Sequence, residues 1–501
     1  MKPRTLLAAS ITAALSITGC TTKSAYYRND ETPPAESVRN GVQHNYNLAF
    51  VEFHEDGYAQ DERQLAEAGK LIRKARKPIV VVYVHGWHNS SKSKDVCRFE
   101  RFIHGLANTP IVRAHGHEIV GVYVGWRGES VDAERLGKLS FVNTFSYWDR
   151  EDAGHLLANG KKVGAGTSLL AAVRQLGREV ESVRARGVGC QSVLLGHSFG
   201  GLVLEETIGQ AIEDGLETGS EDAITWDLAI TLNCANRAAY SRGLLEKLDE
   251  AFTYEAGKGF VARKQRSVVI PAHRSVLIAV GAANDRATKV ALPLGNWLGS
   301  VFKLQMFGLF EDDVLGGKPV NWFTRRPIPY EPGRTAWEGE FNTSSVTNNR
   351  DLINMRVEPL GFAKPSDIPQ IYRDASALEL NVGRDLVGDV FFTRGENDGH
   401  ELIECKDDVF DPASRAAASG DWRRWRFVFD ESRRSLYKVI NVPEEIIDDH
   451  GGIWSDQSVA LIGALFRQQL PLARGEKRQP VRILKDAEAA ASLRQMLQRA
   501  P

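Results

Sequence analysis

Short runs of β-branched and other apolar residues recur along the first 300 residues of the chain, separated by helical patterns. The runs that predict buried parallel strands span 79–84, 119–124, 192–195, 228–232 and 275–280. Apolar positions at helical spacing occur between them, over 169–186 and 202–213. Alternation of strands and helices predicts an α/β fold with a mostly parallel central sheet and helices on both faces.

The alternation fails between residues 291 and 434, which we interpret as a large insertion into the sheet domain. Its apolar part at 292–310 either packs within the insertion, caps a site or contacts lipid. Two further apolar runs, 425–429 and 436–442, flank a short polar segment and predict a β-hairpin. An amphipathic helix is expected after residue 455, with Val459, Ile462, Leu465 and Phe466 on one face.

Composition excludes several classes of protein. The chain is 43% hydrophobic and 25% charged, which is ordinary for a globular protein. Lys and Arg total 63 against 64 Asp and Glu, so no basic surface for nucleic acid is expected. No CxxC or HExxH motif occurs, and we expect neither a metal site nor a cofactor. Pairing among Cys97, Cys190, Cys234 and Cys405 cannot be chosen from the sequence.

The N-terminus has the pattern of a processing signal. A basic start precedes an apolar run over 6–17, which is too short to span a bilayer. The run ends in Ile17-Thr18-Gly19-Cys20, which resembles the lipobox of bacterial lipoproteins. This resemblance implies a signal peptide over 1–19, a lipid on Cys20, a tether over 20–45, and a place in the bacterial cell envelope. The residue after Cys20 is Thr21 rather than Asp, which the same resemblance implies favours the outer over the inner membrane. The alternative is an ordinary secretory signal.

A candidate nucleophile lies between a predicted strand and a predicted helix. Gly196-His197-Ser198-Phe199-Gly200 matches G-x-S-x-G, in which small neighbours permit a tight strand-to-helix turn. With this context the chain resembles the α/β-hydrolase family, and more narrowly its serine esterases and lipases. The resemblance implies that Ser198 is a nucleophile, and His197 is expected to serve packing.

The segment His85-Gly86-Trp87 follows the first of the predicted strands and resembles the oxyanion loop of the same family. Acyl transfer builds an oxyanion that needs two preorganised N–H donors. The resemblance assigns these donors to the backbone of Trp87 and of Phe199. Gly86 allows close approach of the backbone, and His85 is expected to bond to the loop backbone.

A serine nucleophile needs a base and an orienting carboxylate, which in this family follow in the order Ser, acid, His. Asp285 lies just past the predicted strand 275–280, where the family places its acid. His450 precedes the amphipathic helix and is the expected base. His400, which also follows an apolar run, is the alternative base.

The expected organisation has an α/β-hydrolase core over 46–290 and 435–475, the insertion over 291–434 before the catalytic His, and a helical tail over 476–501. The expected function is hydrolysis of a small-molecule or lipid carboxylic ester through an acyl-enzyme, with membrane attachment through Cys20. The alternative is a catalytically silent binding module on the same fold. The oligomeric state is left open.

Overall fold

The computed structural model describes the central part of the chain. The described residues are 46–54, 56–107, 112, 116–128, 147–159, 167–218, 226–263, 269–271, 274–292, 314–315, 318–321, 326–327, 345–362, 390–394 and 422–469. The predicted signal peptide, tether and C-terminal tail lie outside them, as does nearly all of the apolar stretch 292–310. No described helix is long and apolar enough to cross a membrane.

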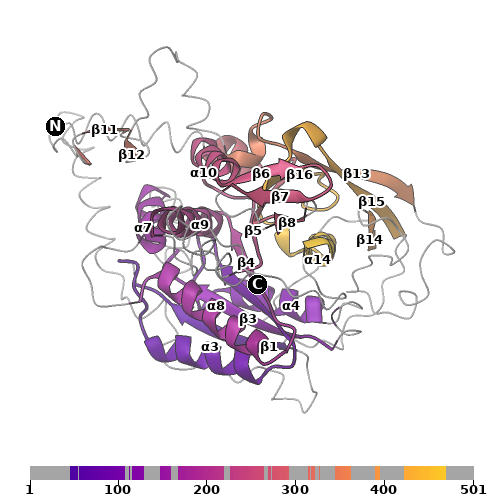
Figure 1. Cartoon of the computed structure of the whole chain (residues 1–501). Helices are drawn as coiled ribbons and strands as arrows, with labels where there is room; N and C mark the ends of the chain where they lie inside the picture. The colour runs from indigo at the N-terminus through magenta and orange to yellow at the C-terminus, as the bar shows by residue number, and fades with distance from the viewer. Residues whose placement is uncertain are drawn as a thin grey trace, which may run out of the picture.

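Among the described residues, the central sheet has ten strands in the order β1-β3-β2-β4-β5-β9-β16-β13-β15-β14. Figure 1 shows β1 and β3 at one side of this sheet and β13, β14 and β15 at the other. All neighbouring strands from β1 to β13 in this order are parallel. In chain order, the parallel strands other than β13 are β1 (Tyr46–Glu52), β2 (Pro78–Val84), β3 (Glu118–Gly125), β4 (Gln191–His197), β5 (Leu228–Leu232), β9 (Leu277–Ala282) and β16 (Tyr437–Val442). Every residue of β2, β4, β5 and β9 is buried, which explains why the middle of each strand is mostly apolar rather than alternating.

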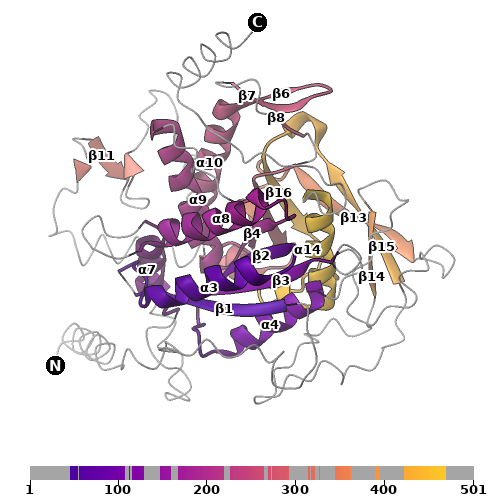
Figure 2. The same ribbon diagram turned by 60° about the horizontal axis from the view of Figure 1, so that its bottom comes forward.

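Helices cover both faces of this sheet (Figure 2). On one face, Val80 and Val82 of β2 share a core with α3 (Glu62–Lys74), α8 (Leu169–Ala185), α9 (Phe199–Thr218) and α10 (Ala238–Ala251). On the other, Ile79 and Val81 share a core with α4 (Lys94–Ala107) and α14 (Asp456–Gln469). Helix α7 (Tyr147–Asn159) packs on α9. The predicted α/β fold is therefore confirmed.

The stretch 291–434 adds strands to the central sheet. Strand β13 (Met355–Phe362) pairs parallel to β16 and antiparallel to β15 (Trp422–Phe429), which in turn pairs with β14 (Val390–Arg394). The predicted hairpin between 425–429 and 436–442 is wrong, because β13 lies between β15 and β16. Local patterning detects strands but cannot see a partner that enters from about 70 residues away in the sequence.

Two smaller three-stranded sheets and four short helices complete the described elements. The sheets comprise β6 (Phe252–Glu255), β7 (Gly259–Ala262) and β8 (Val269–Ile270), and β10 (Val314–Leu315), β11 (Lys318–Asn321) and β12 (Arg326–Pro327). The short helices are η3 (Ala287–Ala291), η4 (Val346–Asn348), η6 (Glu431–Arg433) and η7 (Gly452–Trp454). Cys97 is disulfide-bonded, whereas Cys190 and Cys234 are buried free thiols. Cys20 and Cys405 lie outside the described residues.

Asp95 is a buried carboxyl group that joins α4 to the sheet. Its Oδ2 accepts hydrogen bonds from the hydroxyls of Tyr83 on β2, at 3.1 Å, and Tyr123 on β3, at 3.0 Å. The ring of Trp454, just past the His450 loop, packs edge-on against Tyr83. Burial raises the pKa of Asp95 to about 6, and the hydrogen bonds from the tyrosines offset only part of this rise.

Replacing Asp95 with Asn is expected to remove a pH-dependent loss of stability. The pKa of the folded state lies above the usual 3.8, so the protonated carboxyl stabilises the fold at low pH and this contribution disappears as pH rises through 6. Each pKa unit is worth about 1.4 kcal/mol, so Asp95→Asn should gain about 3 kcal/mol relative to wild type from pH ~3.5 to pH ~7.5. Urea unfolding followed by Trp fluorescence measures the free energy of unfolding of both proteins at each pH. A difference in this free energy that is the same at both pH values would contradict the raised pKa of Asp95.

Candidate active site

The turn between β4 and α9 holds Ser198 in a conformation that side chains rarely adopt. Its φ is 55°, in the left-handed region. Backbone hydrogen bonds stabilise this turn: the Ser198 N–H donates to the Leu232 carbonyl at 3.0 Å, and the Ser198 carbonyl accepts from the N–H of Gly201 at 3.0 Å and of Ala235 at 3.1 Å. The side chain is thereby presented at the carboxyl edge of the sheet, in the geometry of a nucleophile elbow.

The glycines of the elbow are required by close contacts. A Cβ at Gly196 would lie 2.6 Å from the Gly200 carbonyl oxygen, and a Cβ at Gly200 would lie 2.0 Å from the Val84 carbonyl oxygen. Both contacts are with backbone atoms, which cannot move aside as a flexible side chain can. The G-x-S-x-G spacing therefore lets α9 begin directly against the end of β2.

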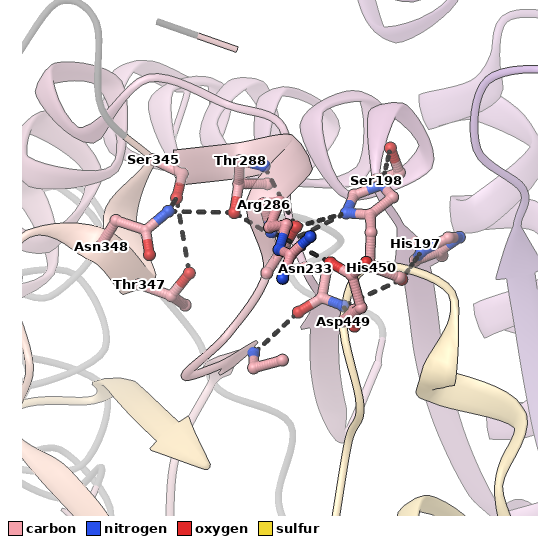
Figure 3. A network of polar contacts seen from close by, with 12 residues as sticks. His197, Ser198, Asn233, Arg286, Thr288, Ser345, Thr347, Asn348, Asp449 and His450 are labelled. Atoms are coloured by element: carbon pink, nitrogen blue, oxygen red, sulfur yellow. Dashed lines mark hydrogen bonds and ion pairs between the residues drawn. The ribbon is translucent and has the colours of Figure 1, made fainter. Parts of the chain in front are cut away.

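The structure brings Ser198, His450 and Asp285 together from three separate elements. His450 Nε2 lies 2.8 Å from Ser198 Oγ (Figure 3). Its Nδ1 lies 3.1 Å and 3.0 Å from the two carboxylate oxygens of Asp285. Asp285 follows β9, and His450 lies in the loop between β16 and α14. Asp285 is only 1% exposed and Ser198 only 7%, whereas the His450 side chain is 25% exposed.

The charge of Asp285 determines which nitrogen of His450 carries hydrogen. Burial alone would raise the pKa of Asp285, but hydrogen bonds from His450 and Thr288 outweigh it and hold the pKa below its usual value. An ionised carboxylate can only accept hydrogen bonds, so Nδ1 of the neutral imidazole is the protonated nitrogen. Nε2 is then the acceptor that faces the Ser198 hydroxyl.

The loop that carries His450 is held through its own backbone. The His450 carbonyl accepts hydrogen bonds from His197 Nε2 and Asn233 Nδ2, both at 3.0 Å. Asn233 Nδ2 also donates to the Asp449 carbonyl at 3.1 Å, and Asn233 Oδ1 accepts from the Ala282 N–H at 2.8 Å. Asn233 thus joins the ends of β5 and β9 to the loop, and the sequence analysis did not identify it.

His197 is a neutral group. Burial, followed by repulsion from the nearby His450, lowers the pKa of His197 to about 3. Because Nε2 donates to a carbonyl, Nδ1 is the bare nitrogen, and this buried atom has no hydrogen-bond partner among the described residues. His197 therefore not only packs in the core but also holds the backbone of His450 through its hydrogen bond to the His450 carbonyl.

The loop after β2 lies beside Ser198. A Cβ at Gly86 would lie 2.8 Å from Ser198 Cβ, so this backbone passes directly against the Ser198 side chain. The rings of Trp87 and Phe199 lie 6.0 Å apart, so the loop after β2 and the start of α9 are neighbours. Trp87 also stacks on His88, whose φ is 63°.

His85 braces this loop with both ring nitrogens. Its Nδ1 donates to the Gly86 carbonyl at 2.9 Å, and its Nε2 accepts the Trp126 N–H at 3.1 Å. The indole N–H of Trp126 donates to the His85 carbonyl at 2.9 Å. Burial lowers the pKa of His85 to about 4, which matches a neutral ring that donates once and accepts once.

Two of the predicted site residues cannot be placed. His400, the alternative base, and Cys20, the predicted lipidation site, lie outside the described residues. Among the residues that are described, no group of three or more His, Cys, Asp or Glu side chains is arranged to hold a metal ion.

The strand order, the elbow after β4 and the loop after β2 define an α/β-hydrolase fold. No family model matches the chain. No curated protein matches it either. One solved structure to which it is similar is an extracellular α/β-hydrolase from a Paenibacillus species, described as sharing structural and functional homology with tobacco salicylic acid binding protein 2. The two are 13% identical with a TM-score of 0.15, over 42% of this chain and 80% of that one. Because this similarity is weak, the fold assignment rests on the strand order, the elbow after β4 and the loop after β2.

Replacing Asn233 with Gly should loosen the His450 loop. Gly tolerates the φ of 45° found at this position, so the variant removes the amide without adding backbone strain. Buried carbonyls that lose their donor cost about 1–3 kcal/mol each. Amide hydrogen exchange over 443–455 should accelerate by about 10-fold or more, whereas Asn349→Gly, in a partly exposed position, should leave it unchanged. Equal exchange in the Asn233→Gly variant and wild type would contradict the assigned role.

Proposed function

We propose that the protein is a serine hydrolase that cleaves a carboxylic ester through an acyl-enzyme, with Ser198 as nucleophile, His450 as base and Asp285 as orienting acid. The observation that carries the proposal is the continuous hydrogen-bonded line from Ser198 Oγ through the His450 ring to the Asp285 carboxylate. These groups converge from distant parts of the chain at the carboxyl edge of a parallel sheet, where this fold builds sites.

The geometry supports a two-step reaction. In the first step Ser198 Oγ attacks the ester carbonyl carbon while His450 Nε2 takes the hydroxyl proton. The tetrahedral intermediate collapses, the alkoxide leaves, and His450 returns the proton to it. In the second step His450 accepts a proton from water, the resulting hydroxide attacks the acyl-enzyme, and Ser198 recovers its proton as the carboxylic acid departs.

The oxyanion of each intermediate needs donors that are fixed beforehand. We assign them to the backbone N–H groups of Trp87 and Phe199, because Phe199 directly follows Ser198 and Trp87 directly follows Gly86, whose backbone passes against the Ser198 side chain. Phe199 is also the first residue of α9, whose N-terminal dipole favours negative charge at this point. The His85 contacts would keep the Trp87 segment in place between turnovers.

An ester is the substrate bond that we assign, because an alkoxide leaves more easily than an amine. A small-molecule or a lipid ester would satisfy the chemistry. The proposed catalytic groups alone do not distinguish them, and the chain-length dependence of hydrolysis below serves that purpose.

A fluorophosphonate probe, which reacts with activated serines, is expected to label wild type and not Ser198→Ala. The catalytic constant for p-nitrophenyl esters of increasing chain length should fall by at least about 10³-fold in the variant. Ser198→Gly, which tolerates the φ of 55°, guards against a folding defect, and Ser182→Ala serves as a control at an exposed serine.

Labelling that persists without the Ser198 hydroxyl would mean that another residue is the nucleophile. A folded wild type that neither labels nor hydrolyses any ester would overturn the proposal in favour of a silent binding module.

We also propose that the mature protein is anchored in the bacterial cell envelope, preferentially the outer membrane, by lipid on Cys20. The support is the segment Ile17-Thr18-Gly19-Cys20 after a short apolar run. A lipidated Cys carries several acyl chains, and stable attachment takes more than one. Cys20→Ser should abolish incorporation of radiolabelled palmitate in bacterial cells and move the protein from the membrane to the soluble fraction. Palmitate incorporation in the variant, or a wild type that stays soluble, would contradict the anchor.

A further inference from the structure

Residues 345–348, which belong to the insertion, pack against the strands that carry the site. Ser345, Val346 and Thr347 are buried. A Cβ at Gly281 of β9 would lie 2.3 Å from Thr347 Cβ and Oγ1, so the absence of a side chain at Gly281 makes room for Thr347. The position of this segment is therefore set by β9, the strand that leads to Asp285.

Two further contacts attach the same segment to the sheet domain. Asn441 Nδ2 at the end of β16 donates to the Thr347 carbonyl at 3.3 Å. Ser345 forms an isolated β-bridge with Arg237, the residue that precedes α10. The segment is thus connected to the strand on the acid side of the site, the strand on the base side, and the helix after β5.

A chain of hydrogen bonds leads from this segment to Asp285. Asn348 Nδ2 donates to Thr288 Oγ1 at 2.9 Å and to Ser345 Oγ at 2.8 Å (Figure 3). Thr288 Oγ1 donates to Asp285 Oδ2 at 2.6 Å, and the Thr288 N–H donates to Asp285 Oδ1 at 3.1 Å. The carboxylate therefore receives hydrogen bonds from His450 on one side and from Thr288 on the other.

The donor and the acceptor of each hydrogen bond between Asn348, Thr288 and Asp285 are determined by the ionised carboxylate. The carboxylate only accepts, so the single hydroxyl hydrogen of Thr288 is committed to Asp285, and Thr288 Oγ1 must accept from Asn348. The amide of Asn348 is consequently oriented with Nδ2 toward Thr288. Its Oδ1 is buried and has no hydrogen-bond partner among the described residues, an arrangement that costs free energy.

We propose that Asn348 is a positioning residue of the site: through the Thr288 hydroxyl it fixes the Asp285 carboxylate in the orientation that holds His450. This inference rests on the proposed function and deepens it, because it assigns a residue of the insertion to the support of the proposed catalytic acid. Asn348 touches no reacting atom. Its effect passes through Thr288 alone.

A double-mutant cycle tests that route. Asn348→Leu and Thr288→Val each remove one link without changing the charge, and each should lower kcat by about 10-fold with KM within about 2-fold. Because both act on the same hydrogen bond to Asp285, Asn348→Leu should add little in a Thr288→Val background. Losses that multiply in the double variant would overturn the proposal, as would a wild-type kcat for Asn348→Leu.

A charge variant provides a readout that a purely structural role would not move. Asn348→Asp keeps the size of the side chain, competes for the Thr288 hydrogen and adds negative charge on the acid side of the site. A negative charge there favours the protonated imidazolium of His450, so the acidic limb of the pH profile of kcat/KM should move to higher pH by about half a unit or more. Asn349→Asp, the same change at the next residue, should leave the limb within about 0.2 units. Identical profiles for the two variants would contradict the inference.

The pH dependence of fluorophosphonate labelling separates this inference from the proposed function. Labelling needs the activated Ser198 but no knowledge of the natural ester. If wild type does not label, the proposed function itself has failed. If wild type labels and the Asn348 variants label at the same rate with the same pH dependence, only the role of Asn348 has failed.

Discussion

The carboxylate of Asp285 is the group on which the arrangement of the site depends. It is buried and ionised, so it can only accept hydrogen bonds and each neighbouring group must donate to it. That single constraint assigns the proton to His450 Nδ1, commits the Thr288 hydroxyl, and orients the neighbouring amide of Asn348. A neutral residue at this position would leave each of those choices open, and the site would then populate several hydrogen-bond patterns instead of one.

The site also depends on the strained backbone of Ser198, which hydrogen bonds to the neighbouring strand segment stabilise. Ser198 adopts a left-handed conformation that costs about 1–3 kcal/mol at a non-glycine residue. The surrounding strands over-determine it, because the Ser198 N–H and carbonyl both bond to the segment at the end of β5. Asn233, one residue past β5, is itself left-handed and secures the His450 loop. The two left-handed residues thus lie just past the ends of the adjacent strands β4 and β5.

Local patterns predict the fold and the candidate site to different extents. Buried strands and α8 are visible as apolar runs, and the glycines around Ser198 reveal the turn between them. Asp285 and His450 are predicted from the family resemblance together with their places after apolar runs. Asn233 and Asn348 are not found, because their partners lie far along the chain and an isolated Asn carries no periodicity. The position of β13 between β15 and β16 is hidden for the same reason: strand order is a long-range property.

An insertion between the acid and the base need not disturb their distance. Strands β9 and β16 pair directly, with Val280 opposite Ile440, so the ends of the insertion are held together by the sheet. Loop-closure entropy grows only slowly with length, so a long excursion adds little to the cost of that pairing. What the insertion does affect is orientation, since it returns to the acid through Asn348. Placement by the sheet and orientation by the insertion are therefore separable: under the proposal, a change in the insertion alters the orientation of the Asp285 carboxylate while its position relative to His450 stays set by β9 and β16.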